Sequence, residues 1–447
     1  MMLNNSIPWQ QVREGMTSKG FWWITGFEGS NIPQMEADEY LWTQHYQNWR
    51  QDLTLVKERL QLKYLRYTFP WYKINPAPGK FKWDWADQVV AQSAELGLNL
   101  ILNPIQFGTP SWLEDSFGNP DYPNYATEYI RQLAQRYGNQ IKYYTPHNEP
   151  LISALFGGDL GHWPPYWQGL DNYVKLVENI SRQIVLSVKA IKAEVPDAVM
   201  IHVEAGEYYA TRSQEKWLQA DVEFRNERRF IIYDLISGRI NLNHPLTEWL
   251  QTQGMSRKTL YWFQEHAIEL DVVGVDFYPH CEAWLEWENG EIVQYRDHGN
   301  SITKAFEATR DSALVKQMVD LPLSLSGLLH QYYDRYGCPV ILTETDYSGL
   351  DEHKSLYLEY SVQEIKRLRA EGVPVIGYTW WPAIDHLNWN NALKERGTIH
   401  PVGLWKLKPQ IDGNLKRVET ESVEVFRKLI TQSDSSVGDV AMVYKQF

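Results

Sequence analysis

The sequence predicts an α/β protein built as a single (β/α)8 barrel, and three observations carry this prediction. Eight short apolar segments alternate along the chain with longer amphipathic stretches, which is the order expected of a parallel sheet covered by helices. The apolar segments are continuous, as in strands that are buried on both faces. No G-x-G-x-x-G sequence opens a helix after a strand, which argues against an open dinucleotide-binding sheet.

Each expected strand follows a stretch with helical periodicity. In one clear case, Trp49, Leu53, Val56 and Leu60 recur at helical spacing, and a strand-like run at 63–69 comes next. Several of these helices are expected to end at a glycine, the residue most common just past a helix C-terminus: Gly97, Gly138, Gly337 and Gly372. The eight strands are expected at residues 21–27, 63–69, 99–105, 141–147, 198–204, 271–277, 339–344 and 374–380.

The chain is expected to form one catalytic domain over residues 1–447, because no Pro/Gly/Ser-rich linker divides it. Residues 1–18 form a short N-terminal extension, and the polar segment from about 433–447 is expected to be a loosely ordered tail. Two stretches exceed what a helix and its loops require, 205–265 after strand five and 281–335 after strand six. They are expected to be loop insertions, and whether they form a lid is left open.

Composition narrows the class of partner. The formal net charge is −13 and the basic residues are scattered, whereas nucleic acid and anionic membranes require a basic face. No segment approaches the roughly eighteen apolar residues of a membrane-spanning helix. Aromatic residues make up 14% of the chain, with 20 Trp, and flat rings pack well on the C–H faces of pyranoses. The expected partner is therefore a small-molecule or oligosaccharide glycoside.

Metal and cofactor chemistry is not expected. The chain has only two cysteines, Cys281 and Cys338, and no H-E-x-x-H sequence, so neither a disulfide framework nor a zinc site is indicated. The N-terminus lacks the basic start and apolar stretch of a secretory signal. Together with the few cysteines, this predicts a cytoplasmic protein. The oligomeric state is left open.

The chemistry of a barrel enzyme lies at the carboxyl ends of its strands. Two carboxyl groups that face each other there can cleave a glycosidic bond without a cofactor. One protonates the leaving oxygen, while the other attacks the anomeric carbon or activates water. Strands four and seven lie roughly opposite in an eight-stranded barrel, so Glu149 and Glu344 are the expected pair. The strand ends hold Glu28, Arg66, Gln106, Asn148, Glu149, Glu204, Glu207, Asp276, Tyr278, Glu344, Trp380 and Trp381.

Five motifs, in register with the predicted strands, resemble those of glycoside hydrolase family 1, the retaining β-glycosidases of clan A. Residues 144–150, YTPHNEP, resemble the family's T-x-N-E-P motif, and residues 341–344, ILTE, resemble I-T-E-N-G. Residues 377–389 resemble the family's G-Y-x-x-W-S-x-x-D-N-x-E-W segment. The further matches are LRYTFPW at 65–71 and GVDFY at 274–278. The likeness covers roughly residues 20–405, as expected of a divergent member.

The resemblance implies a role for each matching residue. Glu149 would be the acid/base and Glu344 the nucleophile of a double displacement, with the two carboxyl groups roughly 5–5.5 Å apart. Asn148 would contact the sugar 2-hydroxyl. Arg66 and Tyr278 would hydrogen-bond the nucleophile and keep it ionised. The remaining expected substrate contacts are Trp381, as the aromatic floor under the sugar, and Gln106, Asn388, Trp389 and Glu28.

Four positions depart from the family pattern, and all belong to the set that contacts the sugar hydroxyls at carbons 3, 4 and 6. Gly26 stands where the family has Gln on strand one, and Gln106 replaces a His on strand three. Asp276 replaces an Asn on strand six, and Asn388 replaces the Glu of F-E-W. The resemblance therefore implies that the reaction is kept and the glycone specificity is altered.

The sequence thus predicts a retaining β-glycosidase that is β-glucosidase-like but holds a different sugar. One alternative is a transglycosidase of the same mechanism, which differs only in whether water or another acceptor reaches the anomeric carbon. A second alternative is a non-catalytic carbohydrate-binding barrel, suggested by the altered hydroxyl contacts. The presence of both glutamates and Arg66 argues against a pure binding protein, which needs no acid beside a base.

Overall fold

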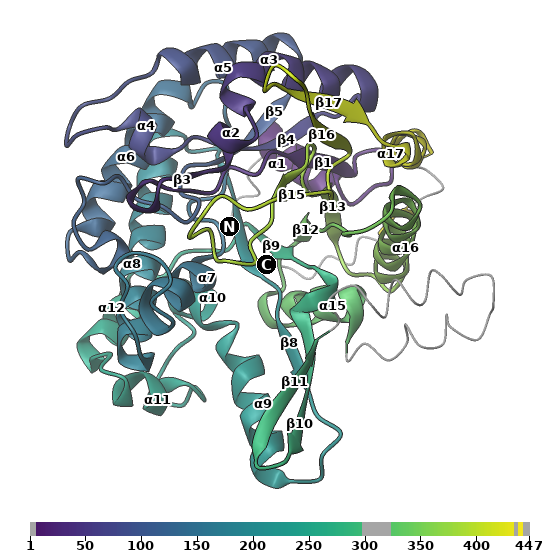
Figure 1. The fold of residues 1–447 in the computed structure, drawn as a ribbon. Helices are drawn as coiled ribbons and strands as arrows, with labels where there is room; N and C mark the ends of the chain where they lie inside the picture. Colours follow the sequence, from purple (N-terminus) through teal and green to yellow (C-terminus); the bar gives the residue numbers. More distant parts are fainter. Residues whose placement is uncertain (1–5, 297–322, 433–436, 441–447) are drawn as a thin grey trace.

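The computed structural model describes residues 6–296, 323–432 and 437–440. Eight parallel strands close into a (β/α)8 barrel in the order β1-β13-β12-β9-β7-β6-β5-β4 (Figure 1). Thr25 of β1 stands level with Leu65 of β4 on one side and Trp380 of β13 on the other, which closes the sheet. The predicted fold class is confirmed. The strands are β1 Trp22–Gly26, β4 Tyr64–Thr68, β5 Asn99–Asn103, β6 Tyr143–Tyr144, β7 Val199–Ala205, β9 Val272–Asp276, β12 Val340–Glu344 and β13 Val375–Trp380.

Helices surround the barrel because each has one apolar face to bury against the strands. In α8 the residues at helical spacing, Val177, Ile180, Ile184 and Val188, are all buried. The main outer helices are α3 His45–Leu55, α5 Asp84–Glu95, α6 Tyr122–Tyr137, α8 Leu170–Glu194, α10 Ile231–Ile236, α12 Arg257–Glu265, α15 Ser324–Tyr336, α16 Asp351–Ala370 and α17 Glu421–Thr431. Short helices α2 Glu39–Trp42, α4 Trp71–Ile74 and α11 Thr247–Thr252 lie in the connections.

The glycines expected at helix ends behave in two ways. Gly97, Gly337 and Gly372 have positive φ angles of 63°, 72° and 91°, the left-handed conformation that glycine adopts without a steric cost. Gly138 directly follows the last residue of α6, as expected, but it has φ −62° and stays right-handed. A Cβ at Gly138 would lie 2.3 Å from Val195 Cγ2, so close packing accounts for this glycine.

The inside of the barrel is filled by large apolar side chains, and the N-terminal extension covers one end of it. Helix α1, Ile7–Glu14, places Val12 in the same buried cluster as Trp22, Ile24 and Tyr143. The Trp22 indole donates a hydrogen bond of 3.2 Å to the Gln11 carbonyl. The amino-terminal end of the barrel is therefore closed, and the opposite end carries the site.

The two insertions fold together. Strand β8, Tyr208–Ala210, comes from the first insertion and pairs with β10, Glu282–Glu288, which comes from the second. Strand β11, Glu291–Arg296, completes a three-stranded sheet. Helix α9, Lys216–Arg228, packs on this sheet, and the unit projects from the barrel (Figure 1). Residues 297–322 of the second insertion lie outside the described residues. Whether the insertions form a lid therefore stays open for this segment.

The segment after β13 forms short two-stranded sheets on the way to α17. They are β14 His386–Leu387 with β15 Ile399–His400, and β16 Trp405–Pro409 with β17 Leu415–Glu419. A further small sheet, β2 Asn31–Ile32 with β3 Ala37–Asp38, follows β1.

The described part of the tail is packed rather than loose. Val437 is fully buried, and the Arg369 guanidinium donates to its carbonyl oxygen at 3.1 Å. Residues 433–436 and 441–447 of the expected tail lie outside the described residues, so the expectation of a loosely ordered tail stays a prediction. Among the helices that the structure describes, none is both long and apolar enough to cross a membrane.

Candidate active site

A cavity of about 540 Å³ opens at the carboxyl ends of the barrel strands, within the usual size of a small-molecule site. The structure brings nearly all the predicted site residues to it. Arg66 lies beneath the cavity and contacts two of the lining residues. The predicted residues that line the cavity are Glu28, Gln106, Asn148, Glu149, Tyr278, Glu344, Trp381, Asn388 and Trp389. We call this cavity the catalytic cleft.

Glu344, the last residue of β12, is held at both carboxylate oxygens. The Arg66 guanidinium donates to Oε1 at 2.6 Å, and the Tyr278 hydroxyl donates to Oε2 at 2.5 Å. Arg66 is itself only 1% exposed and also donates to Asn148 Oδ1 at 2.7 Å. Because the guanidinium is always charged and both contacts are donors, this surrounding favours the ionised form of Glu344.

Glu149 is held in an unusual backbone conformation. It directly precedes α7, Pro150–Ala154, with φ 42° and ψ 62°, a left-handed geometry that costs a non-glycine residue roughly 1–3 kcal/mol. Its side chain is 9% exposed and lines the cleft. Strained positions of this kind often lie in active sites, and here the conformation presents a carboxyl group to the cavity.

Asp276 is the third carboxyl group in this centre, and its position differs from the predicted one. Asp276 was expected among the sugar-contacting positions, but it is 0% exposed and lies behind the residues that line the cleft. It stands level with Glu344 on the neighbouring strand, after a shift in register between β12 and β9. One carboxylate oxygen from each of Glu149, Asp276 and Glu344 lies within 4.8 Å of the other two. Arg66, 3.9 Å from Asp276, supplies a compensating charge.

The three carboxyl groups do not titrate alike. Burial raises the pKa of Glu149 and of Glu344 well above their usual range, and the Asp276 charge raises both further. Arg66 and Tyr278 oppose this effect at Glu344, where they bind directly. Burial also raises the pKa of Asp276, to about 6, against the Arg66 charge. Arg66 and Tyr278 therefore favour the ionised form of Glu344, whereas the neighbouring carboxylates Asp276, Glu344, Glu204 and Glu28 all add to the raised pKa of Glu149.

The wall beside β1 and β13 explains why residue 26 is a glycine. A Cβ built at Gly26 would lie 2.3 Å from the Trp381 ring and 2.7 Å from the Arg66 carbonyl oxygen. The Trp381 indole donates to Glu28 Oε2 at 2.9 Å. The aromatic ring thus occupies the space that a glutamine at this position would need.

Gln106 is tied into the protein rather than left free. Its amide nitrogen donates to Glu28 Oε1 at 2.8 Å, and its oxygen accepts from Asn103 at 2.9 Å and from the Thr68 hydroxyl. One amide hydrogen of Gln106 remains for a ligand. Glu28 in turn also accepts from the backbone of Ser30 at 2.9 Å. Both residues line the cleft through a rigid network.

Asn388 and Trp389 line the far wall. The side-chain nitrogen of Asn388 donates to the Thr398 carbonyl oxygen at 3.3 Å. The side-chain oxygen of Asn388 remains available to other partners. The Trp389 ring packs edge-on against Phe107, with ring centres 5.1 Å apart. Its buried indole nitrogen has no hydrogen-bond partner among the described residues. A buried donor without a partner is costly, and a ligand hydroxyl in the cleft would satisfy it.

Sequence reasoning missed several polar residues that line the cleft, among them Asp346, His386 and His400. Asp346 is 8% exposed, and burial raises its pKa to about 8 against the charge of Lys354. His386 and His400 lie 3.4 Å apart between ring nitrogens, and burial lowers the pKa of each to about 4, which keeps both neutral. Asp346 follows the strand-seven motif by two residues, so its position was a usable signal. Nothing near His400 in the sequence pointed to the cleft.

Comparisons with known proteins agree with this geometry. A sequence model of glycosyl hydrolase family 1 matches residues 24–435. The 1,4-β-D-glucan glucohydrolase of Thermotoga neapolitana is 20% identical over 371 residues, covering 79% of this chain and 84% of that protein. The 6-phospho-β-glucosidase of Dickeya chrysanthemi is 23% identical over 381 residues, covering 78% and 77%. The family 1 β-glucosidase structure from Thermotoga maritima superposes with a TM-score of 0.74 at 18% identity, covering 92% of this chain and 98% of that chain.

Proposed function

This chain belongs to glycosyl hydrolase family 1, and from that premise we propose that it is a retaining β-glycosidase with Glu344 as nucleophile and Glu149 as acid/base. One observation carries the proposal. Two facing carboxyl groups have oxygens within 4.8 Å of each other, yet only Glu344 is bound by Arg66 and Tyr278. Retaining enzymes need this short separation and this division between an ionised and a protonated carboxyl group.

In the first step, a Glu344 oxygen attacks the anomeric carbon from the face opposite the leaving group. The bond to the glycosidic oxygen breaks as Glu149 gives that oxygen its proton. The leaving group departs as an alcohol, and the sugar remains as an ester of Glu344. Asn148, fixed by Arg66 at 2.7 Å, lies beside the nucleophile where it can bind the 2-hydroxyl, a contact that strengthens in the transition state.

In the second step, the Glu149 carboxylate takes a proton from water as the water oxygen attacks the anomeric carbon. The ester bond breaks, and Glu344 recovers its charge. The pKa of Glu149 drives this exchange of roles, because esterification removes one of the charges that raise it. Two displacements at one carbon return the original configuration, so the product is the β-anomer.

The glycone is proposed to be an uncharged sugar. No lysine or arginine is among the described residues that line the cleft, so a phosphate or carboxylate on the sugar would meet no compensating charge. Glu344, which lines the cleft and must be ionised to act as nucleophile, would repel such a group.

The proposal is tested with aryl β-glycosides of glucose, 6-deoxy sugars, pentoses, uronic acids and 6-phosphoglucose. The wild type is expected to hydrolyse at least one neutral glycoside and to leave the uronides and phosphoglucosides largely intact. Glu344→Gly is expected to lose this activity and to regain turnover with azide, giving the α-glycosyl azide. Full activity of Glu344→Gly would overturn the nucleophile assignment. Accumulation of transfer products instead of free sugar would point to a transglycosidase.

A further inference from the structure

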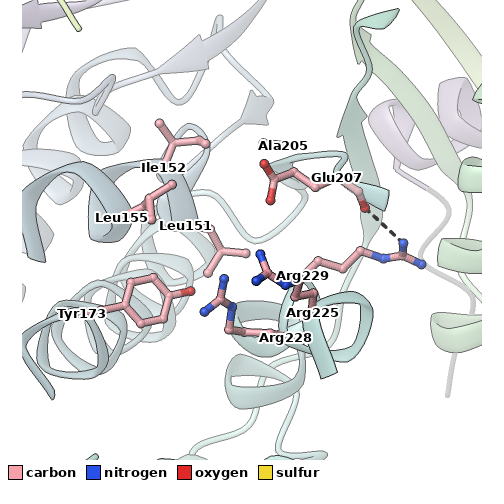
Figure 2. A pocket seen from close by; sticks show the side chains of 9 residues that line it. All are labelled: Leu151, Ile152, Leu155, Tyr173, Ala205, Glu207, Arg225, Arg228 and Arg229. Atoms are coloured by element: carbon pink, nitrogen blue, oxygen red, sulfur yellow. Dashed lines mark hydrogen bonds between the residues drawn. The ribbon is translucent and has the colours of Figure 1, made fainter. Parts of the chain in front are cut away.

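A second, smaller cavity lies beside the catalytic cleft. It measures about 40 Å³, and three of its lining residues, Ile152, Ala205 and Glu207, also line the cleft. The two cavities are therefore adjacent. Figure 2 shows the arginines that line it, at the end of α9 and just after it, reaching toward Leu151, Tyr173 and Glu207. These arginines are Arg225, Arg228 and Arg229, and we call this cavity the arginine pocket.

The arginine pocket lies on the leaving-group side of the cleft. Leu151 and Ile152 lie on α7, two and three residues after Glu149, and Glu207 lies two residues after the end of β7. The sugar wall, in contrast, is built by the ends of β1, β5 and β13. Since Glu149 is proposed to protonate the leaving oxygen, a group attached beyond that oxygen would pass these residues first.

The arginines of the pocket differ in how far their charges are compensated. The Arg228 guanidinium lies 5.6 Å from the Tyr173 ring and makes no ion pair or hydrogen bond with another described residue. Arg225 uses its Nε for Asp221 at 2.7 Å, which leaves its other nitrogens for the pocket. Arg229 is 6% exposed, and burial lowers its pKa.

The partners of Arg229 are a backbone carbonyl and an amide rather than a carboxylate. It donates to the Glu207 carbonyl at 3.0 Å and to the side chain of Gln331. A buried guanidinium without a carboxylate bound to it is costly. An anion in the pocket would supply Arg228 with the counter-charge it lacks and add a second one beside Arg225, whose Nε is already bound to Asp221.

We propose that the arginine pocket is an anion-binding subsite for the leaving group, so that the preferred substrate carries a carboxylate, sulfate or phosphate on its aglycone. This inference rests on the proposed function. Arginine presents planar pairs of donors that match such oxyanions. A volume of about 40 Å³ holds roughly three water molecules at 10–15 Å³ each, which suits one anionic group and excludes a second sugar ring.

Charge then orients the substrate along the cleft. The sugar end is lined by carboxyl groups, and the leaving-group end opens to the arginine pocket. An anionic aglycone is attracted at one end and repelled at the other, whereas an anionic sugar meets the opposite situation. Productive and reversed binding therefore differ in electrostatic energy before any hydroxyl is recognised.

The test compares aryl β-glycosides whose phenyl ring carries a carboxylate with partners that carry the carboxamide, with zero, one or two methylenes before the charged group. The sugar is the neutral one that the wild type hydrolyses fastest. At one spacer length or more, kcat/KM is expected to be roughly tenfold higher for the carboxylate, mainly through KM. Arg228→Gln is expected to abolish this preference and leave carboxamide turnover unchanged. Arg257→Gln, at the exposed start of α12, is the matched control and should keep the preference.

Equal kcat/KM for carboxylate and carboxamide at every spacer length in the wild type would overturn the subsite. A preference that survives in the Arg225→Gln/Arg228→Gln double variant would do the same. If the wild type hydrolyses neither compound, the proposed function fails, and calorimetry with the matching S-linked glycosides then decides the subsite alone. Tighter binding of the S-linked carboxylate, lost in Arg228→Gln, would support it, and equal binding would not.

Discussion

The reaction centre and the sugar wall of the catalytic cleft differ in how closely their residues match the family motifs, although one barrel carries both. At the reaction centre, Arg66, Tyr278 and Glu344 are joined by contacts of 2.5–2.6 Å, and these three residues match the family motifs. On the sugar wall, Gly26 and Asn388 replace larger or charged family residues. Bond cleavage needs charges fixed at defined positions, whereas hydroxyl recognition can be rebuilt from different donors and acceptors.

The largest expected loss of activity comes from a substitution at the reaction centre rather than on the sugar wall. Glu344→Gln removes the nucleophile and keeps its size, so kcat on any accepted glycoside should fall roughly 10⁴–10⁶-fold, as for other enzymes that lose a nucleophile. Circular dichroism and thermal unfolding check that the variant is folded. A loss smaller than tenfold would mean that the centre does not work as proposed.

Glu149→Gln should reveal the acid by its dependence on the leaving group. We expect kcat/KM for alkyl glycosides to fall roughly 10²–10⁴-fold, the usual contribution of a general acid. For dinitrophenyl glycosides the loss should be much smaller, because this group departs without protonation. Steady-state rates on both substrates measure the difference, and equal losses on the two would argue against an acid role.

Asp276→Asn should move the pH profile more than the maximum rate. The Asp276 charge raises the pKa of Glu149 and of Glu344, so removing it lowers both. Activity is lost as pH rises through the pKa of the acid and as it falls through that of the nucleophile. Both limbs of kcat/KM should therefore shift to lower pH, with a several-fold loss above neutrality. A reduced rate with unshifted limbs would indicate a purely structural role.

The smallest effect is expected on the wall. Asn388→Glu restores a charged hydrogen-bond acceptor, and such a bond is worth roughly tenfold in discrimination. The ratio of kcat/KM for glucosides over 6-deoxyglycosides and pentosides should rise by about this factor, while Glu344 chemistry is unaffected. If kcat falls equally for all sugars, Asn388 does not act in recognition.

A feature of the fold or of the site could be predicted where its signal lies within one short segment of the sequence. The eight strands were predicted because each is a short buried run with its own apolar signature. Glu149 and Glu344 were predicted because their motifs end strands. Asp276 was assigned to sugar contact because the sequence of a strand end does not show whether a side chain lines the cleft or lies beneath it. Only the register between β9 and β12 decides this.

Contacts between distant segments could not be predicted from the sequence. The sheet of β8 and β10 joins two insertions at Tyr209 and Ala283, which are 74 residues apart in the chain, and neither strand's sequence indicates the other as its partner. The pairing of His386 with His400 and the arginine pocket beside Ile152 arise in the same way. Each depends on packing between elements that carry no pattern in common.

The central claim is that Glu344 and Glu149 act by double displacement, and the first product formed tests it most directly. A neutral β-glycoside that the wild type accepts is hydrolysed in deuterated buffer, and proton NMR follows the anomeric signals before mutarotation. The β-anomer is expected to appear first and the α-anomer only later, at the rate of mutarotation. Initial release of the α-anomer would contradict double displacement by Glu344 and Glu149.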